Sequence, residues 1–171
     1  MGGIRMRLSK HVEEALYVIL ILATQKEHQP LKSNQLSEIL NVSDSSLKKV
    51  LRQLVVNELI ISSASKDGGF ELKKKIKEIT LLDIVEAIES NTLITYTPNN
   101  VAETIFSRKE HARKSEQYFI DGFNQASEAY AAALKKIKIA TILEEESIRL
   151  GTIDWAKIIL SRKENQHEID Q

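Results

Sequence analysis

Residues 33–72 read SNQLSEILNVSDSSLKKVLRQLVVNELIISSASKDGGFEL and decide the fold of this chain. The first half of the stretch has the apolar spacing of two short helices, and the second half alternates as a β-hairpin does. Between the helices, Ser37 is small enough for two crossing helices to touch, Asn41 suits a left-handed turn, and Val42 is an apolar plug. Ser43 is a residue type that caps helix N-termini. This layout predicts a winged helix-turn-helix.

The helix that follows Ser43 has one apolar and one polar face. Its apolar residues recur at steps of three and four, which indicates that they face a core; they are Leu47, Val50, Leu51 and Leu54. The outward side chains are hydroxyl-bearing or basic, as suits a helix lying in a DNA major groove. We expect base-edge contacts from Ser45, Ser46 and Lys49, and phosphate contacts from Lys48 and Arg52.

The hairpin is predicted to form a wing. Its strand sides are Leu59–Ile61 and Phe70–Leu72, and Gly68 and Gly69 are expected to supply the positive φ of a tight loop. Lys66 lies at the tip, where it can contact a phosphate or a minor groove, or be an ordinary solvated residue. The predicted DNA-binding set is Ser43, Ser45, Ser46, Lys48, Lys49, Arg52, Lys66, Gly68 and Gly69.

Two further helices complete the predicted winged helix-turn-helix domain, which we assign to residues 6–90, with Met6 as a candidate natural start. One helix runs from a cap at Ser9 to about Gln25 and has apolar residues on more than one side. The other begins at the sequence Thr80-Leu-Leu-Asp83, which has the pattern of a capping box, and runs through Glu89. The fold class is therefore mainly α with a small β-hairpin wing.

The rest of the chain is predicted to hold a connector and a long dimerisation helix. Residues 91–111 lack periodicity and are expected to form an irregular connector. A long helix is expected from Ala112 to Ile137, in a region of dimerisation and C-terminal helices spanning 112–162, before a flexible tail at 163–171. One stripe along this helix suits packing against an identical helix, although packing on its own domain is also open; it consists of Phe119, Phe123, Ala126, Tyr130, Ala133 and Ile137.

Two further helical patterns follow the long helix. Thr141-Ile-Leu-Glu144 has the pattern of a second capping box, and a last helix is expected from Ile153 to about Leu160.

Composition narrows the possible functions. The formal net charge of the chain is zero, but residues 1–80 hold 13 basic and 9 acidic side chains, so the basic excess lies in the predicted wing domain. The chain has no cysteine, and its four histidines lack metal-ligand spacing, so we expect neither a disulfide nor a metal site. No membrane span, signal peptide or catalytic motif is evident, which favours a cytoplasmic protein that is not an enzyme.

These residues resemble the bacterial winged-helix repressors of the Rrf-two family, typified by the iron–sulfur regulator, the nitric-oxide regulator and the cysteine-metabolism repressor. The resemblance rests on Met6-Arg-Leu-Ser9, Ser43 with 47–54, Leu59-Ile60, Gly68-Gly69-Phe70 before Leu72, and 79–87. It implies a homodimer formed through the long helix, bound to a pseudo-palindromic operator in double-stranded DNA. It also implies that the connector senses a signal.

The chain departs from the family pattern at several positions. Ser46 replaces a common tyrosine, Ala64-Ser65 replaces an Arg-Gly pair in the wing, and Glu58 stands where glycine is common. The iron–sulfur members carry three cysteines in the connector, which are missing here, so we expect a regulator without a cluster or other cofactor. Its effector is then a small molecule, held between the connector and the DNA-binding domain, or a protein partner.

Two functions remain open at this point. One is a sequence-specific, DNA-binding transcriptional regulator, most simply a repressor. The alternative is a winged-helix protein-interaction module that has lost DNA binding, which Asp44, Glu58 and the missing wing arginine favour. Salt-dependent binding to a DNA duplex distinguishes them.

Overall fold

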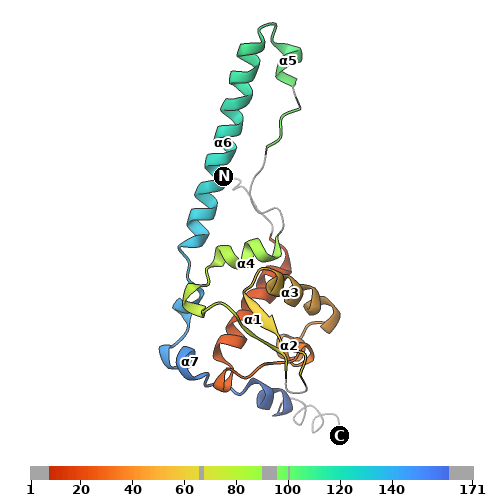
Figure 1. Cartoon of the computed structure of the whole chain (residues 1–171), viewed down its shortest axis with the longest axis vertical. Coiled ribbons are helices and arrows are strands. Elements are labelled where there is room, and N and C mark those ends of the chain that lie inside the picture. The colour runs from red at the N-terminus through yellow and green to blue at the C-terminus, as the bar shows by residue number, and fades with distance from the viewer. Residues whose placement is uncertain (1–7, 66–67, 90–95, 100, 162–171) are drawn as a thin grey trace, which may run out of the picture.

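The structure is a computed structural model that describes residues 8–65, 68–89, 96–99 and 101–161. Figure 1 shows a body from which one long helix, α6, extends as an arm, with α5 folded back beside its far end. Lys66 lies outside the described residues. The elements are α1 (Lys10–Thr24), η1 (Lys26–His28), α2 (Ser33–Leu40), α3 (Asp44–Val56), β1 (Ile60–Ser62), β2 (Phe70–Leu72), η2 (Ile76–Glu78), α4 (Leu81–Ile88), α5 (Val101–Ile105), α6 (Lys109–Lys135), η3 (Ile139–Ile142) and α7 (Glu145–Leu150), followed by helical residues 155–161.

The core of the body forms around α1. Ala15, Val18 and Ile19 on this helix are fully buried, and Ile21, Leu22 and Ala23 are almost so. A helix that is apolar on several sides must be covered on several sides. Helices α2, α3, α4 and α7 and strand β2 all pack against it.

Helices α2 and α3 end in the same hydrogen-bonding motif. Asn41 has a φ of 53°, and the amide of Val42 donates to the carbonyl of Ser37 at 3.0 Å. At the end of α3, Glu58 has a φ of 59°, and the amide of Leu59 donates to the carbonyl of Leu54 at 3.0 Å. Both are Schellman-type ends, which place one residue in the left-handed region. The turn predicted at Asn41 is confirmed, whereas the turn at Glu58 was not predicted.

The wing is a two-stranded antiparallel hairpin that is tied to the body. Ile60 pairs with Leu72, and Ser62 pairs with Phe70. Leu31 lies in the loop before α2. Its amide donates to the carbonyl of Phe70 at 3.1 Å, and the amide of Phe70 donates to the carbonyl of Leu31 at 2.8 Å. The loop before α2 is thereby paired with the end of the hairpin that lies nearest its connecting loop.

The two wing glycines have a different role from the predicted one. Among the described residues, Gly151 is the only glycine with a positive φ, so Gly68 and Gly69 do not supply one. A Cβ atom on Gly68 would lie 2.4 Å from the carbonyl oxygen of Ser63, and one on Gly69 would lie 2.5 Å from that of Leu31. Both positions require glycine because another backbone segment passes too close for a side chain.

The predicted capping box at α4 is confirmed. The amide of Asp83 donates to Thr80 Oγ1 at 3.2 Å, and the amide of Thr80 donates to Asp83 Oδ2 at 2.7 Å. Lys74, at the base of the wing, donates to Asp83 Oδ1 at 2.7 Å. The cap therefore also fastens the wing segment to α4.

The arm differs from the predicted connector and long helix in three ways. Residues 101–105, expected to be irregular, form α5, and α6 begins at Lys109 rather than Ala112. Helix α6 ends at Lys135, so Ile137 lies beyond it. The reason is tertiary: the Ile137 carbonyl accepts from the amide of Leu81 at 2.9 Å, which draws the chain into a bridge with the start of α4.

The C-terminal segment is fastened to the end of α1. Ile153 forms a parallel bridge with Gln25, and Trp155 Nε1 donates to Thr24 Oγ1 at 3.1 Å. The predicted capping box at Thr141 is wrong, because Thr141 belongs to η3 and α7 begins after Glu144. Bonds to a distant segment, rather than local capping, organise this part of the chain.

A pH dependence follows from the cap of α4. Burial alone raises the pKa of Asp83, but hydrogen bonds from Lys74 and Thr80 outweigh it and hold the pKa below its ordinary value. The ionised carboxyl therefore stabilises the fold above about pH 4, and this stabilisation is lost as the pH falls through the lowered pKa. We expect Asp83→Asn to lower the melting temperature at pH 7, and to lower it by less at pH 3. Glu86→Gln, on the exposed face of the same helix, is the control. If Asp83→Asn lowered the melting temperature equally at both pH values, the stabilisation would not come from the ionised Asp83 carboxyl.

A second stability prediction concerns Glu58. A non-glycine residue in the left-handed region carries backbone strain, which glycine relieves. We expect Glu58→Gly to raise the melting temperature by a few degrees, measured by circular dichroism. Glu58→Ala is the matched control, because it removes the carboxylate and keeps the strain. Equal gains in the two variants would assign the effect to charge instead of backbone conformation.

Candidate nucleic-acid interface

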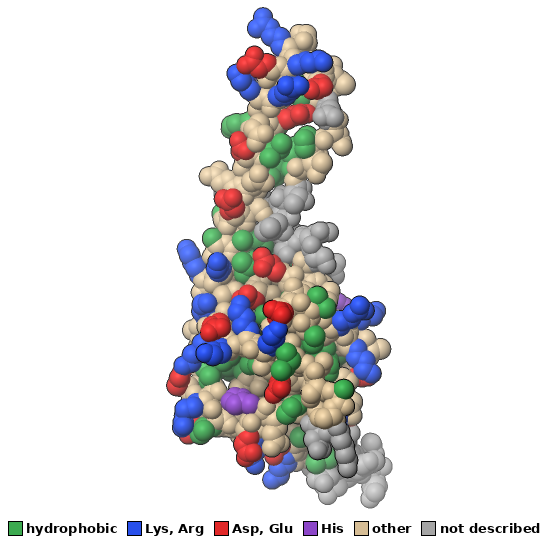
Figure 2. Space-filling model, in the orientation of Figure 1, with side chains coloured by type: hydrophobic (Ala, Val, Ile, Leu, Met, Phe, Trp, Pro, Cys, Tyr) green, Lys and Arg blue, Asp and Glu red, His purple; other side chains and the backbone are tan. Residues whose placement is uncertain are grey.

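Helix α3 presents a polar face to solvent. Its buried residues, Leu47, Val50, Leu51 and Leu54, are at most 1% exposed and pack into the core. The side chains of Ser45, Lys48, Lys49 and Arg52 are exposed, and Ser46 is half-buried. Figure 2 shows Lys and Arg side chains on the flank of the body where Figure 1 places α3. The predicted division of the helix into a core face and an outward face is confirmed.

Three serines gather at the N-terminus of α3. Ser43 caps the helix as predicted, since its Oγ accepts from the amide of Ser46 at 3.3 Å. The Oγ atoms of Ser43 and Ser45 are 3.5 Å apart. Hydroxyl groups can donate to and accept from base edges or phosphates, and the positive end of the helix dipole favours an anion here. This end of α3 is therefore suited to contact DNA.

An ion pair within α3 changes the role of one predicted phosphate contact. Lys48 Nζ lies 2.6 Å from Asp44 Oδ2, one helical turn away. The hydrogen bond from Lys48 is the main reason that the pKa of Asp44 is lowered, so the carboxyl is ionised at neutral pH. Lys48 must leave this partner to neutralise a phosphate, whereas Lys49 and Arg52 form no ion pair with any described residue. The i,i+4 spacing of Asp44 and Lys48 was the sequence signal for this pair.

A second ion pair lies between α3 and the wing. Lys73 Nζ, just after β2, is 2.6 Å from Glu58 Oε1, and this contact lowers the pKa of Glu58. Glu58 is exposed, so it places a negative charge at the wing base and occupies a lysine that would otherwise face solvent. Sequence reasoning identified Glu58 as a departure from the family pattern but not Lys73 as its partner.

Two amide side chains hold α3 against α4. Gln53 Nε2 donates to the carbonyl of Ile88, and Asn57 Nδ2 donates to the carbonyl of Ala87, both at 3.4 Å. Beside them, Lys49 and Arg52 line a hollow of about 550 Å³ between the two helices. These amides were not predicted, because nothing in the local sequence indicates a partner 30 or more residues away.

This arrangement defines a class of protein. A helix-turn-helix whose second helix exposes serine and basic side chains, followed by a hairpin wing, is a winged-helix DNA-binding fold. The family model described as "Rrf2: Iron-dependent Transcriptional regulator" matches residues 8–145. The chain belongs to the Rrf2 family of transcriptional regulators, and it is not an enzyme.

Named relatives agree with this family. The chain is 30% identical to the candidate HTH-type transcriptional regulator YffB of Lactococcus lactis over 151 residues, which cover 87% of this chain and 96% of YffB. It is 33% identical to the candidate regulator YwgB of Bacillus subtilis over 106 residues, covering 62% and 67% of the two chains. The predicted family and the predicted role in transcription are confirmed.

Solved structures share the fold. CymR, the global cysteine regulator of B. subtilis, superposes with a TM-score of 0.56 at 16% identity, over 79% of this chain and 94% of CymR. IscR of T. potens superposes with a TM-score of 0.56, also at 16% identity, over 85% and 91%. The predicted fold class, mainly α with a hairpin wing, is confirmed.

The side chains present do not fit an iron–sulfur cluster. Such clusters are held mainly by cysteine thiolates, and this chain has no cysteine. Within the described ranges, no three or more His, Asp or Glu side chains are grouped so as to hold a metal ion. In the same ranges, no helix is long and apolar enough to cross a membrane.

Proposed function

We propose that this regulator binds a pseudo-palindromic operator as a homodimer and represses transcription without an iron–sulfur cluster. The observation that carries the proposal is the outward face of α3, which is polar and basic while its opposite face is fully buried. Two such helices related by two-fold symmetry enter successive major grooves when their spacing is about one turn of DNA.

Within this proposal the residues have separate roles. Ser45, Ser46 and Lys49 are close to the exposed start of α3 and read base edges. Arg52 and Lys48 contact phosphates, Lys48 only after it separates from Asp44. Ser43 positions the helix start, and Lys66 of the wing contacts the adjacent minor groove or its phosphates.

The arm supports the dimer. Of the 27 residues of α6, only Ala112 and Ser127 are buried. Phe119 is 55% exposed and Phe123 is 40% exposed, and Ala126 and Ala133 of the same stripe are exposed as well. Figure 2 shows apolar side chains exposed along the arm and charged ones at its far tip. Large aromatic side chains exposed together on one helix favour a protein–protein interface.

A hollow on the arm fits a second helix. It measures about 740 Å³ and is lined by three aromatic, two small and two polar residues: Tyr118, Phe119 and Phe123, Gly122 and Ala126, and Asp121 and Gln125. A Cβ atom on Gly122 would meet nothing within 4 Å, so there is room for a side chain from a partner. Aromatic side chains beside small ones form the knobs and holes with which two helices interlock. Ala133 and Tyr130 extend this surface toward the body, whereas Ile137 lies beyond the helix.

The DNA-reading roles are tested by selecting bound duplexes from a random pool and titrating the winners with salt. We expect a two-fold-symmetric site with a steep salt dependence. Lys49→Ala should relax the base preference, whereas Arg52→Ala should weaken all sequences alike and lower the salt slope by about 1 per lost phosphate contact.

Lys109→Ala, at the far end of the arm, is the control for these variants and should change neither quantity. If Lys49→Ala altered only the overall affinity, the assignment of Lys49 as a base reader would be wrong. If the parent chain showed no salt-dependent binding to any duplex, the protein-interaction module would replace the proposal. Transcription from a template carrying the selected site, with and without the protein, tests repression.

The dimer is tested by placing a charge in the stripe. We expect Phe123→Lys to convert the protein to a monomer in sedimentation velocity at about 10 μM, because a lysine buried in an apolar interface loses its hydration. Affinity for the two-fold site should fall at least tenfold, since half the contacts are lost (about 1.4 kcal/mol is a factor of ten).

Asn124→Lys is the matched control, because it adds the same charge on the opposite side of α6, where Asn124 is exposed. It should leave the dimer intact. Circular dichroism checks that Phe123→Lys keeps its helix content, since Phe123 also stacks on Tyr96 with ring centroids 5.1 Å apart. A folded Phe123→Lys variant that remains dimeric would rule out this interface.

A further inference from the structure

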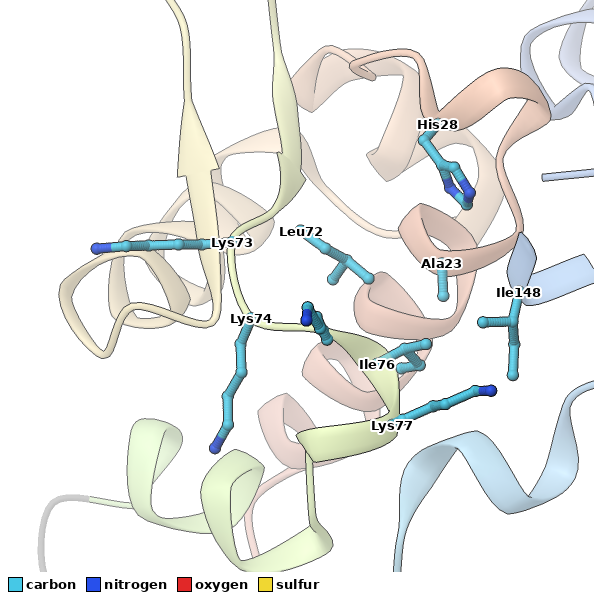
Figure 3. A pocket seen from close by; sticks show the side chains of 9 residues that line it. Ala23, His28, Leu72, Lys73, Lys74, Ile76, Lys77 and Ile148 are labelled. Atoms are coloured by element: carbon cyan, nitrogen blue, oxygen red, sulfur yellow. The ribbon is translucent and has the colours of Figure 1, made fainter. Parts of the chain in front are cut away.

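A separate hollow of about 310 Å³ lies between the end of α1, the segment after β2, and α7. Figure 3 shows the side chains of Ala23, Leu72, Ile76 and Ile148 around it, with His28 at one end. Four lysines also line it: Lys73, Lys74, Lys75 and Lys77. Its volume is at the lower end of the range for small-molecule sites.

The floor of this hollow is apolar. Ala23 and Ile76 are buried parts of the core, and the half-buried Leu72 and Ile148 pack against that core. An apolar group that enters the hollow would therefore rest on the core itself. Ile148 lies past residue 145, where the match to the family model ends, so one wall comes from outside the matched region.

Three of the four lysines are already paired with carboxylates. Lys73 pairs with Glu58, Lys74 with Asp83, and Lys77 with Glu145. In Figure 3 the side chains of Lys73 and Lys74 point away from the hollow, whereas Lys77 extends toward Ile148.

Lys75 forms no ion pair with any residue that the structure describes. The lining therefore carries one positive charge, on the exposed side chain of Lys75, that no described carboxylate pairs with. An apolar floor with a single unbalanced ammonium group favours a ligand that has one negative charge and a compact apolar body.

We propose that this hollow is an effector site for a small monocarboxylate with an aromatic or branched apolar body. The carboxylate pairs with Lys75 and accepts a second hydrogen bond from the His28 imidazole, and the apolar body contacts Leu72, Ile76 and Ile148. This site differs from the one expected from the sequence, which was placed between the connector and the DNA-binding domain.

The position of the site links it to the wing. Leu72 is the last residue of β2 and pairs with Ile60. The amides of Lys73 and Lys74 both donate to the carbonyl of Leu59, just after α3, at 3.0 and 3.3 Å. A ligand that contacts Leu72 and Lys75 therefore holds the wing base in one position. This regulatory role rests on the proposed function: a ligand that prefers one wing position changes DNA affinity, and DNA changes ligand affinity by the same factor.

Binding is tested first without DNA, by isothermal titration calorimetry on the full chain. The probe is phenylacetate, with phenylacetamide as its uncharged match and inorganic phosphate as an anion without an apolar body. We expect a Kd for phenylacetate below about 1 mM, and binding of the amide about tenfold weaker. Equal binding of acid and amide, or phosphate binding as tight as phenylacetate binding, would overturn the proposal.

Two variants locate the site. Lys75→Met should remove the preference for acid over amide, and Ile148→Trp should fill the hollow and abolish binding of both probes. Lys109→Met, on the arm, is the matched control and should bind like the parent chain. Melting temperatures check that each variant is folded. Phenylacetate binding that both site variants leave unchanged would place the ligand elsewhere and refute the proposal.

Regulation is tested by measuring the Kd of the selected duplex with and without saturating phenylacetate. We expect a change of at least about fivefold, which is lost in Lys75→Met. Probe binding with no DNA binding would reject the proposed function and keep the site. DNA binding with no probe binding would reject the site alone, and probe binding without a change in DNA affinity would reject the regulatory role.

Discussion

The structure depends on the need to cover α1 on nearly every side. Ala15, Val18 and Ile19 are fully buried, whereas Glu13 and Tyr17 on the remaining face are exposed, and burying apolar side chains is the main favourable term in folding. Helices α2, α3 and α4 and the wing cover part of this surface, and the C-terminal segment covers the rest. Helix α3 is thus held in place by the same contacts that stabilise the fold. The site and the core cannot be changed independently, because the buried face of α3 is part of the covering of α1.

Local signals predicted the body of the protein well. The spacing of apolar residues in α1 to α4, the cap at Ser43 and the capping box at Thr80 are all interactions within a few residues, and each is present in the structure. The glycine pair of the wing was placed correctly but for the wrong reason. Its cause is the passage of Leu31 and Ser63, which sequence patterns do not show.

Predictions were weakest where distant segments determine the structure. The helix α5 and the start of α7 were not predicted, and the end of α6 lies beside a long-range bond from the Leu81 amide to the Ile137 carbonyl. In the interface, the outward face of α3 could be predicted from its period, whereas the position of Lys73 beside Glu58 required the folded hairpin. Glu58 combines a feature visible in the sequence with one visible only in the fold. The sequence marked it as unusual, whereas only its positive φ explains why glycine suits that position.

The fastening of the C-terminal segment to α1 also has a consequence for how the chain is made. Trp155 and Thr24 are 131 positions apart, so the end of α1 cannot be fully covered until the ribosome has released the segment around Ile153. Before that point a winged-helix core can assemble, but one apolar flank of α1 stays exposed on the nascent chain. Contacts of such long sequence separation also form late because closing the loop costs entropy. A chain shortened before Ile153 should therefore be recognised by chaperones as incomplete, even though every residue of α3 and of the wing is present.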